Sequence, residues 1–522
     1  MRISFYKFRF VLCLCLFYFL VTNLFAKQTS KNSTSSKNSS TKVEEYKNPS
    51  FRPLFTAEEQ LGYTPKDILT ADEVFKLSLL FSECPLDSKE AQIALQKFEL
   101  IKKGVTTKEF TKMSEEERGR AVLKFLYKDT LKKYSLNQSK VDVVFKNGEY
   151  NCVSSALIYM AAAKAAGLDV RGVKTPLHAF CSVYVLAKGS KGAGAGTNAG
   201  KTRIDVETTN PYGFNPGSKE TIENENNIKR YYVVPKKHYS NRQEVSDKVF
   251  TGLVAGNLCS DYIKSGNYIK AVPLGAARFN LVIDENSSVQ KEVRNDFDIL
   301  PCNYISIRPK SAEKYYNMLA WFTEFVDFWG NDDYIQKSID PAFNNLFVLC
   351  YEEKNYDLAK DSYEKIGPYA SKNQRAKAEE ILADLFLTSK IEGLSSREQI
   401  KTINEIKNSV EFTPNQLQRV NVILENAWIQ ILNAHMKNKD FAAGYKDSLI
   451  AMEQVPSSAN FKKANQTFYS NCIAQVHNEF AKQANKRNYN QALKILNEGL
   501  KNYPNDKTLT KDMTELKKVM KK

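Results

Sequence analysis

The stretch NCVSSALIYMAAAKAAGLDVRGVKTPLHAFCSVYVL at residues 151–186, with RIDVETTN at residues 203–210, decides how this chain folds. Small and apolar residues run almost unbroken through 152–166 and a glycine follows as a stop signal, so a helix is predicted there. The apolar runs at 170–173 and 179–186 then predict two strands. A helix followed by strands in one short segment indicates an α+β domain.

Three side chains in this region are the groups that a nucleophilic cysteine site needs. Cys152 lies at the predicted helix start, where free N–H groups and the helix dipole favour a thiolate and could also stabilise an oxyanion. His178 begins a predicted strand and could exchange a proton with the thiol, while Glu207 could orient the imidazole. Asp205, two residues earlier on the same strand face, is the alternative acid. Cys181 alternates onto the strand face opposite His178 and is expected to be a buried apolar residue.

A glycine-rich interruption separates His178 from Glu207. The tract KGSKGAGAGTNAGK at residues 188–201 has no apolar periodicity and is predicted to be an exposed hairpin loop. The flanking strands then pair, which places His178 and Glu207 on neighbouring strands. Residues 195–202, AGTNAGKT, fit a relaxed phosphate-loop pattern, but a strand rather than a helix is predicted after them, so we do not expect a nucleotide site.

In combination these motifs resemble the transglutaminase-like branch of the papain-like fold. A cysteine opens a helix of small residues, GLDVRGV follows at 167–173, HAF begins at His178 and ETT begins at Glu207. The resemblance implies an α+β fold in which the cysteine helix packs on an antiparallel sheet that bears the histidine and the acid. It also implies a triad of Cys152, His178 and Glu207. The sequence departs from the family at Asn151, where glycine is common, and at Glu207, where aspartate is usual.

The activity that the resemblance implies is acyl transfer through a thioester. The cysteine would attack an amide or peptide carbonyl; water would then give hydrolysis, as in a peptidase or amidase, and an amine would give cross-linking. We expect hydrolysis, because many bacterial members of the family resemble peptidases or amidases. The alternative is a catalytically inactive domain that serves, with the rest of the chain, as a scaffold for protein binding.

Beyond about residue 246 the chain shows continuous helical patterning with a degenerate repeat. Four times a turn and an aromatic residue open a predicted helix that has a small residue three positions further on. These starts are GNY at 266–268, KNY at 354–356, KDF at 439–441 and RNY at 487–489. The pattern resembles the second half of a tetratricopeptide repeat, which implies an all-α solenoid over 246–522 that binds a protein partner.

The N-terminal segment is typical of a secretory signal peptide. Basic residues precede an apolar run at 10–21, and a small residue follows, which indicates a signal over 1–26 and an exported, periplasmic or extracellular protein. An uncleaved signal, or lipidation of a cysteine within it, would instead anchor the chain to a membrane. Residues 27–51 are rich in Ser, Thr, Asn and Lys and are predicted to be a disordered linker. The transglutaminase-like domain is then expected over 52–245, and no later stretch is apolar enough for an integral membrane domain.

Charge and cysteine usage argue against several other classes of protein. The formal net charge of +16 is spread along the chain without a nucleic-acid recognition motif, so we expect a basic surface and no nucleic acid. Nine cysteines less the two in the signal leave seven, which are scattered and contain no CxxC pair. This pattern argues against a disulfide framework and a structural zinc site. We therefore expect at least one free thiol, no metal and no cofactor, and a protein or peptide as substrate.

Overall fold

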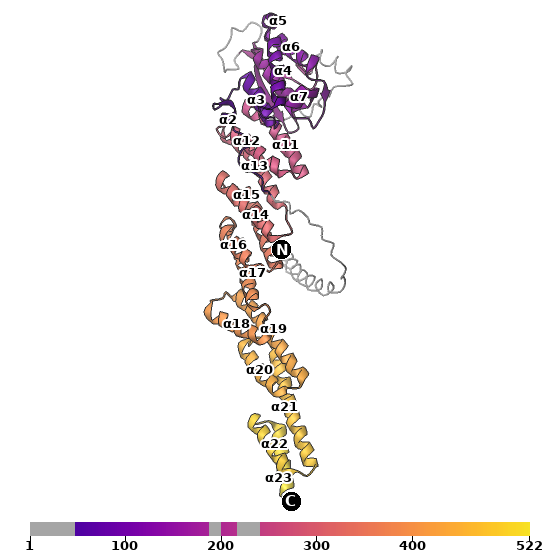
Figure 1. Ribbon diagram of the computed structural model, residues 1–522, viewed down its shortest axis with the longest axis vertical. Helices are drawn as coiled ribbons and strands as arrows, with labels where there is room; N and C mark the ends of the chain where they lie inside the picture. The colour runs from indigo at the N-terminus through magenta and orange to yellow at the C-terminus, as the bar shows by residue number, and fades with distance from the viewer. Residues whose placement is uncertain (1–46, 187–199, 217–240, 522) are drawn as a thin grey trace, which may run out of the picture. The chain divides into compact units, whose positions relative to one another are not determined.

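The computed structural model describes residues 47–186, 200–216 and 241–521. The expected signal peptide, most of the expected linker and most of the glycine-rich loop lie outside these residues. Helices dominate the described chain, and a small antiparallel sheet lies in its first part (Figure 1). The elements of this part are α2 (Ala57–Leu61), α3 (Ala71–Phe81), α4 (Lys89–Val105), α5 (Lys108–Lys112), α6 (Glu115–Asp129), β1 (Lys133–Tyr134), α7 (Val141–Asn147), β2 (Glu149–Tyr150), α8 (Cys152–Ala165), β3 (Asp169–Thr175), β4 (His178–Leu186), β5 (Lys201–Val206), β6 (Gln243–Val245) and α10 (Asp247–Thr251).

The main sheet has four strands in the order β5-β4-β3-β6, and all neighbouring strands are antiparallel. Strands β3 and β4 form a tight hairpin in which Thr175 is paired with His178. Strands β4 and β5 flank the glycine-rich loop, and Cys181 is paired with Val206. The predicted pairing of these two strands is confirmed, and it places the residues that follow β5 beside the start of β4.

Helix α8 lies at the centre of this part of the chain. Its residues 153–163 are all buried, so the helix has no solvent-facing side, and its alanines allow neighbouring elements to approach closely. Cys181 on β4 donates a hydrogen bond from Sγ to Ala156 O at 3.3 Å, so this face of the sheet packs on α8. Cys181 itself is buried, as expected. Gly167 follows the helix with a φ of +78°, a conformation that glycine adopts without strain.

From residue 253 onward the described chain consists of helices joined by short turns. These are α11 (Leu253–Ser265), α12 (Tyr268–Leu281), α13 (Ser287–Ser306), α14 (Ala312–Trp329), α15 (Asp333–Glu352), α16 (Tyr356–Lys365), the 3-10 helix η2 (Gly367–Tyr369), α17 (Lys372–Ile391), α18 (Ser396–Ser409), α19 (Pro414–Asn438), α20 (Phe441–Gln454), α21 (Ala459–Asn485), α22 (Tyr489–Asn502) and α23 (Lys507–Met520). Within the described residues, no helix combines the length and apolar character that crossing a membrane requires.

The four predicted helix starts of this region are confirmed. Helices α12, α16, α20 and α22 begin at Tyr268, Tyr356, Phe441 and Tyr489. Two positions before each start the backbone has a positive φ, between +54° and +70°. The same turn therefore recurs four times, and each time it packs the new helix against the one before it.

One cluster of buried apolar side chains joins the sheet to the helices that follow it. It extends from Phe55 to Leu385 and includes residues of α8, β4 and helices α11–α17. Two further clusters lie within residues 387–468 and 473–516. The α+β part and the helices that follow it therefore share one core, and the last helices have cores of their own.

The final residues of the expected linker are held against this helical region. Asn48 accepts a hydrogen bond from Tyr304 OH at 2.7 Å and donates one to Asn317 O at 3.2 Å. Trp329 Nε1 donates to Phe51 O at 2.8 Å. Residues 48–51, which were expected to belong to a disordered linker, are therefore held in place, because their polar groups find partners on helices that are distant in sequence.

Candidate active site

The chain enters α8 through a capping arrangement that Asn151 organises. Asn151 Oδ1 accepts hydrogen bonds from the N–H groups of Val153 at 2.9 Å and Ser154 at 3.1 Å. Ser154 Oγ accepts one from the Asn151 N–H at 3.0 Å, and Asn151 Nδ2 donates to Ser139 Oγ at 2.8 Å. The Asn151 side chain therefore satisfies first-turn donors that would otherwise lack a partner.

Cys152 is the first residue of α8 and, among the cysteines of the described residues, the one that is partly exposed. The others are buried, and burial raises the pKa of each thiol: Cys84, Cys181, Cys259, Cys302, Cys350 and Cys472. All seven are free thiols, which is more than the one free thiol that the odd number of cysteines required. A molecule in solution therefore reaches Cys152 more readily than any other described thiol.

The imidazole of His178 joins this thiol to a carboxylate. His178 Nε2 lies 2.6 Å from Glu207 Oε2, and the Cys152 side chain is close enough to the ring to help raise the His178 pKa. Since Nε2 is engaged by the carboxylate, Nδ1 is the ring nitrogen left for the thiol. The His178 and Glu207 side chains are only 4% and 3% exposed. The structure thus brings together all three residues of the predicted triad, in the order thiol, imidazole, carboxylate.

Glu207 directly follows β5 and is held from several sides. Its second oxygen, Oε1, accepts hydrogen bonds from Thr209 Oγ1 at 2.7 Å and from the Thr209 N–H at 3.1 Å. Its own N–H donates to Gly213 O at 2.8 Å. A Cβ atom on Gly213 would lie only 1.9 Å from Glu207 O, so the loop that returns past the acid leaves no space for a side chain there.

The segment that carries the acid is tied to the cysteine helix. Thr208 Oγ1 lies 2.9 Å from the hydroxyl of Ser155, which is in the first turn of α8. Tyr127 OH donates to Thr208 O at 2.8 Å and lies 3.0 Å from Tyr150 OH. These contacts fix the acid segment relative to the start of the helix, and therefore relative to the nucleophile.

Mutual contact keeps His178 and Glu207 charged. Burial opposes a charge on His178, but the negative charge and hydrogen bond of Glu207, together with the nearby Cys152 side chain, outweigh it and raise the His178 pKa well above the ordinary 6.5. Burial also favours protonated Glu207, but the charge and hydrogen bond of His178 and the hydrogen bonds from Thr209 lower the Glu207 pKa below 4.5. The site therefore holds an imidazolium and a carboxylate at neutral pH.

The first turn of α8 has fewer unpaired backbone N–H groups than the sequence predicted. The N–H groups of Val153 and Ser154 are bound by the Asn151 side chain, and the Ser155 N–H donates to Asn151 O at 3.1 Å. Within the described residues we find no hydrogen-bond partner for the Cys152 N–H. This amide is therefore the first-turn donor that can face an oxyanion formed on a carbonyl carbon bound to the sulfur.

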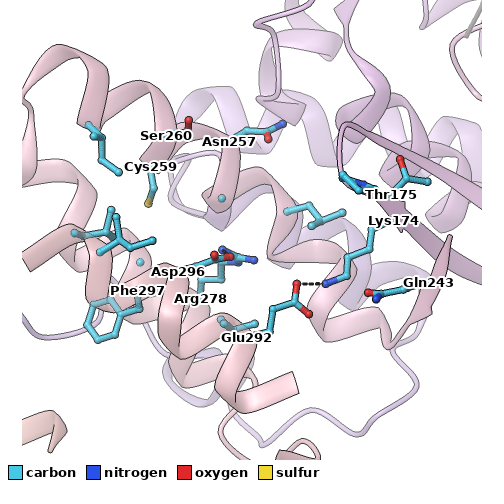
Figure 2. Close-up of a pocket in the computed structure, with 18 of the residues that line it drawn as sticks. Lys174, Thr175, Gln243, Asn257, Cys259, Ser260, Arg278, Glu292, Asp296 and Phe297 are labelled. Atoms are coloured by element: carbon cyan, nitrogen blue, oxygen red, sulfur yellow. Dashed lines mark hydrogen bonds and ion pairs between the residues drawn. The ribbon is translucent and has the colours of Figure 1, made fainter. Parts of the chain in front are cut away.

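A cavity of about 590 Å³ adjoins the site, between the β3–β4 turn and helices α11–α13 (Figure 2). Thr175, the cross-strand partner of His178, lines it on the sheet side. Asn257 lines it on the helix side, and its Nδ2 donates at 2.9 Å to the same Ser139 Oγ that Asn151 binds. The cavity is thus lined by the strand partner of His178 and by a residue that shares Ser139 with the helix cap at Asn151.

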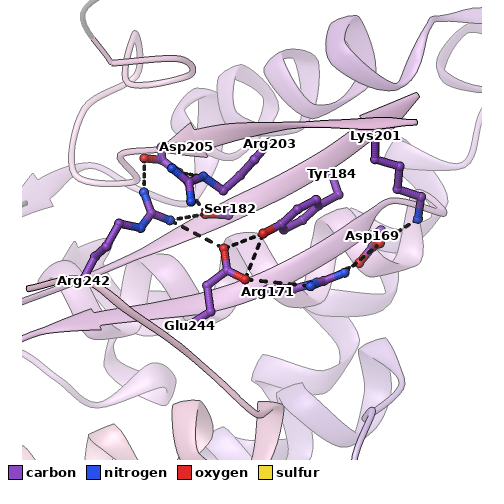
Figure 3. Close-up of polar contacts among 9 residues, drawn as sticks. All are labelled: Asp169, Arg171, Ser182, Tyr184, Lys201, Arg203, Asp205, Arg242 and Glu244. Atoms are coloured by element: carbon purple, nitrogen blue, oxygen red, sulfur yellow. Dashed lines mark hydrogen bonds and ion pairs between the residues drawn. The ribbon is translucent and has the colours of Figure 1, made fainter. Parts of the chain in front are cut away.

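Asp205, the alternative acid, lies in a different polar network on the sheet (Figure 3). Its carboxylate forms an ion pair with Arg242 and accepts a hydrogen bond from Ser182 Oγ at 2.9 Å. Ser182 is also its cross-strand partner, which places Asp205 further along β4 than the start of the strand, where His178 lies. The other members of this network are Asp169, Arg171, Tyr184, Lys201, Arg203 and Glu244. Glu207, and not Asp205, is the acid that binds His178 Nε2.

The phosphate-loop-like tract leads into a strand. Its last residues, Lys201 and Thr202, begin β5, so no helix follows them, while residues 195–199 lie outside the described part. The lack of a helix N-terminus removes the geometry that cradles phosphate groups in such loops. In the described ranges we also find no group of three or more His, Cys, Asp or Glu side chains placed to hold a metal ion.

In comparisons with known proteins, the chain matches no protein family, no curated protein and no solved structure. What defines the site is therefore its own geometry: a partly exposed thiol at a helix start, a buried imidazole and a buried carboxylate in hydrogen-bond contact. Sequence reasoning missed the supporting residues Asn151, Thr209 and Gly213. Of these, only Asn151 had a readable local signal, an N-cap asparagine followed three residues later by a serine that completes the cap.

Proposed function

We propose that this chain is a transglutaminase-like cysteine enzyme that hydrolyses amide or peptide bonds through a thioester on Cys152. The observation that supports this most is the placement of Cys152 beside the His178 imidazole, which forms a hydrogen bond with Glu207. An antiparallel sheet with the cysteine helix packed on it is compatible with the papain-like architecture of that family. The signal-like N-terminus extends the proposal to an exported, periplasmic or extracellular enzyme.

In the first half of the reaction Cys152 is the nucleophile. The imidazolium of His178 stabilises the thiolate, and the sulfur forms a bond to the substrate carbonyl carbon. The displaced electron pair moves to the carbonyl oxygen, which accepts a hydrogen bond from the Cys152 N–H. When the oxyanion collapses, the C–N bond breaks and the nitrogen takes the proton of His178. An amine leaves, and a thioester and a neutral imidazole remain.

Water completes the reaction. Neutral His178 takes a proton from water, the oxygen attacks the thioester carbon, and the C–S bond breaks. The products are a carboxylic acid and the original thiolate and imidazolium. Glu207 keeps the imidazole oriented and stays ionised throughout. Because the Cys152 side chain is partly exposed, water can reach the thioester, which favours hydrolysis in this proposal.

Reaction with p-nitrophenyl acetate tests the proposal without knowledge of the natural substrate. We expect a burst of p-nitrophenolate from the full chain and an acetyl group on Cys152, located by mass spectrometry of the digested protein. Cys152→Ser and His178→Ala should lose the burst. Cys181→Ser is the matched control and should keep it, because Cys181 is buried. Failure of the wild-type chain to acetylate Cys152, or an unchanged burst in Cys152→Ser, would refute the proposal.

A second candidate function is protein binding by the helical repeats, with or without catalysis. The recurring turn favours it, as does a groove of about 770 Å³ between α20, α21 and α22. Gln475 is exposed on α21 and lines this groove. We expect the immobilised full-length Cys152→Ala variant to retain a protein partner. The same variant with the additional substitution Gln475→Trp should retain less of that partner. Identical retention by both chains would count against binding in the groove.

A further inference from the structure

We infer that the cavity beside His178 binds the part of a substrate polypeptide that follows the cleaved bond, on its amine side. The inference rests on the proposed function and names its substrate class, an extended polypeptide with several residues beyond the scissile bond. Helices α11, α12 and α13 line the cavity opposite the β3–β4 turn (Figure 2). The first helices of the repeat region therefore supply one wall of the substrate site.

The position of the cavity assigns it to the amine side. His178 must deliver its proton to the leaving nitrogen, so the chain attached to that nitrogen has to pass the imidazole. Thr175 and Pro176, in the turn that leads directly into His178, line the cavity. Thr175 Oγ1 donates to His178 O at 3.2 Å, which fixes the turn to the residue that transfers the proton. A chain that extends from the thioester carbon past the imidazole therefore enters the cavity.

The charges in the cavity wall cancel in pairs. Lys174 on β3 forms an ion pair with Glu292 on α13, and this pair is drawn in Figure 2. Arg278 on α12 lies 2.8 Å from Asp296, also on α13. An ionic ligand would have to break one of these pairs and would meet no uncompensated charge in return. The wall is therefore suited to a ligand whose polar groups are neutral, such as a peptide main chain.

Carboxamide side chains supply the matching hydrogen-bond groups. Gln243 on β6 and Asn257 on α11 both line the cavity (Figure 2), and Asn241, two residues before Gln243, lines it as well. Each carboxamide carries donors and an acceptor, as each peptide unit does, so it can bind a main chain regardless of the side chains. A volume of about 590 Å³ is within the usual range of ligand sites, roughly 300–1,000 Å³, and suits an extended segment.

The helical wall is formed before any ligand binds. A Cβ atom on Gly275 would lie 2.3 Å from Leu300 Cδ1, so α12 and α13 are in close contact. The Arg278 guanidinium lies across α11, since a Cβ atom on Gly256 would be 3.3 Å from its Nη1. A wall that needs no rearrangement costs little ordering entropy when a flexible peptide binds to it.

Partition of the acetyl-enzyme between amines of different length tests the inference. A site that binds the leaving amine of a peptide can also bind an amine that attacks the acetyl-enzyme. The acetyl group on Cys152 should therefore transfer to trialanine amide at least tenfold faster than to alaninamide at equal concentration, because only the longer amine fills the cavity. Ser260→Trp on α11 and Gln243→Trp on β6 narrow the cavity from its two sides and should each abolish this advantage. Asp261→Trp is the matched control, because Asp261 is the next residue on α11 and is not part of the cavity wall.

The outcomes separate the inference from the proposed function. No acetylation of Cys152 in the wild-type chain would refute the proposed function and the inference together. Acetylation with equal transfer to both amines would refute the inference alone. So would a length advantage that persists in both Ser260→Trp and Gln243→Trp while their hydrolysis by water matches that of the wild type. The two substitutions lie on different secondary-structure elements, so the test can still be carried out with one variant if the other misfolds.

Discussion

His178 Nε2 and Glu207 Oε2 lie 2.6 Å apart in a region where both side chains are almost completely shielded from solvent. A buried ion pair is costly unless its remaining polar atoms are also satisfied. Here Thr209 binds the second carboxylate oxygen, and the Cys152 side chain lies beside the imidazole ring. The buried pair therefore lies beside Cys152, a residue that is itself partly exposed.

Removal of the acid should change the charge state of His178. In the wild type the raised pKa of His178 means that its imidazolium stabilises the fold fully below pH 6.5, and that this contribution is lost as the pH rises through the raised value. In Glu207→Gln the attractive charge is gone and burial remains, so the pKa should fall. We expect the free energy of unfolding of the variant to be about 3–5 kcal/mol lower than that of the wild type near pH 6.5. The difference should shrink at alkaline pH.

Histidine NMR and urea unfolding as a function of pH measure this directly, because the chain has only four histidines to resolve. Asp205→Asn is the control. It removes a carboxylate from β5, but this carboxylate binds Ser182 and not the His178 imidazole. The pKa of His178 should therefore stay at its raised value. A His178 titration near 6.5 in the wild type would show that the pair is not charged as described.

The capping role of Asn151 predicts a stability effect that extends to the nucleophile. Asn151→Ala removes the acceptor for the Val153 and Ser154 N–H groups and the donor to Ser139. We expect the free energy of unfolding to fall by about 1–2 kcal/mol, and the p-nitrophenolate burst to fall with it as the helix start loosens. Asn151→Ser keeps a capping oxygen and should recover most of the stability. Equal stability of the alanine and serine variants would contradict this role.

The close approach of Gly213 to the acid predicts that a single methyl group disturbs the site. In Gly213→Ala the new Cβ would meet Glu207 O at 1.9 Å, and backbone cannot rotate away as a side chain can. We expect a loss of about 1–3 kcal/mol of stability and a weaker p-nitrophenolate burst. Gly393→Ala is the control: its φ of +76° also disfavours alanine, but it lies on a distant turn with open space around it. It should lower stability and leave the burst unchanged.

Packing of the last helices should be separable from the active site. A Cβ atom on Gly444 would lie 2.2 Å from Phe468 Cε1, where α20 contacts α21. Gly444→Ala should therefore destabilise the C-terminal helices by about 1–3 kcal/mol, measured by urea unfolding. Because residues 387–468 form a cluster apart from that of α8, acetylation of Cys152 should proceed at the wild-type rate. A reduced rate would mean that the two regions are coupled.

Local patterns were sufficient for the elements that carry the site. The helix at Cys152, the strand at His178 and the four aromatic helix starts were predictable because each depends on residues within one or two turns of the chain. The choice between Asp205 and Glu207 was not fully local. Both lie on one strand face, and only the pairing of β5 with β4 puts Asp205 opposite Ser182 and leaves Glu207 near the start of β4.

The supporting contacts could not be predicted, because they join residues that are far apart in sequence. Thr208 meets Ser155 across 53 positions, and Tyr127 reaches Thr208 across 81. The cavity likewise depends on how α11–α13 pack beside the β3–β4 turn, which no periodicity in the sequence encodes. Asn151 shows the same limit: its cap is local, but its bond to Ser139 and the link from there to Asn257 are not.

The rate of Cys152 alkylation by iodoacetamide near pH 6 tests the central claim most directly. The rate is measured by mass spectrometry for the folded wild-type chain, the urea-unfolded chain and folded His178→Ala. If the imidazolium of His178 stabilises a reactive thiolate, Cys152 should react at least tenfold faster in the folded wild type than in either reference. Alkylation that is no faster than in the unfolded chain and is unchanged in His178→Ala would contradict a nucleophilic cysteine site.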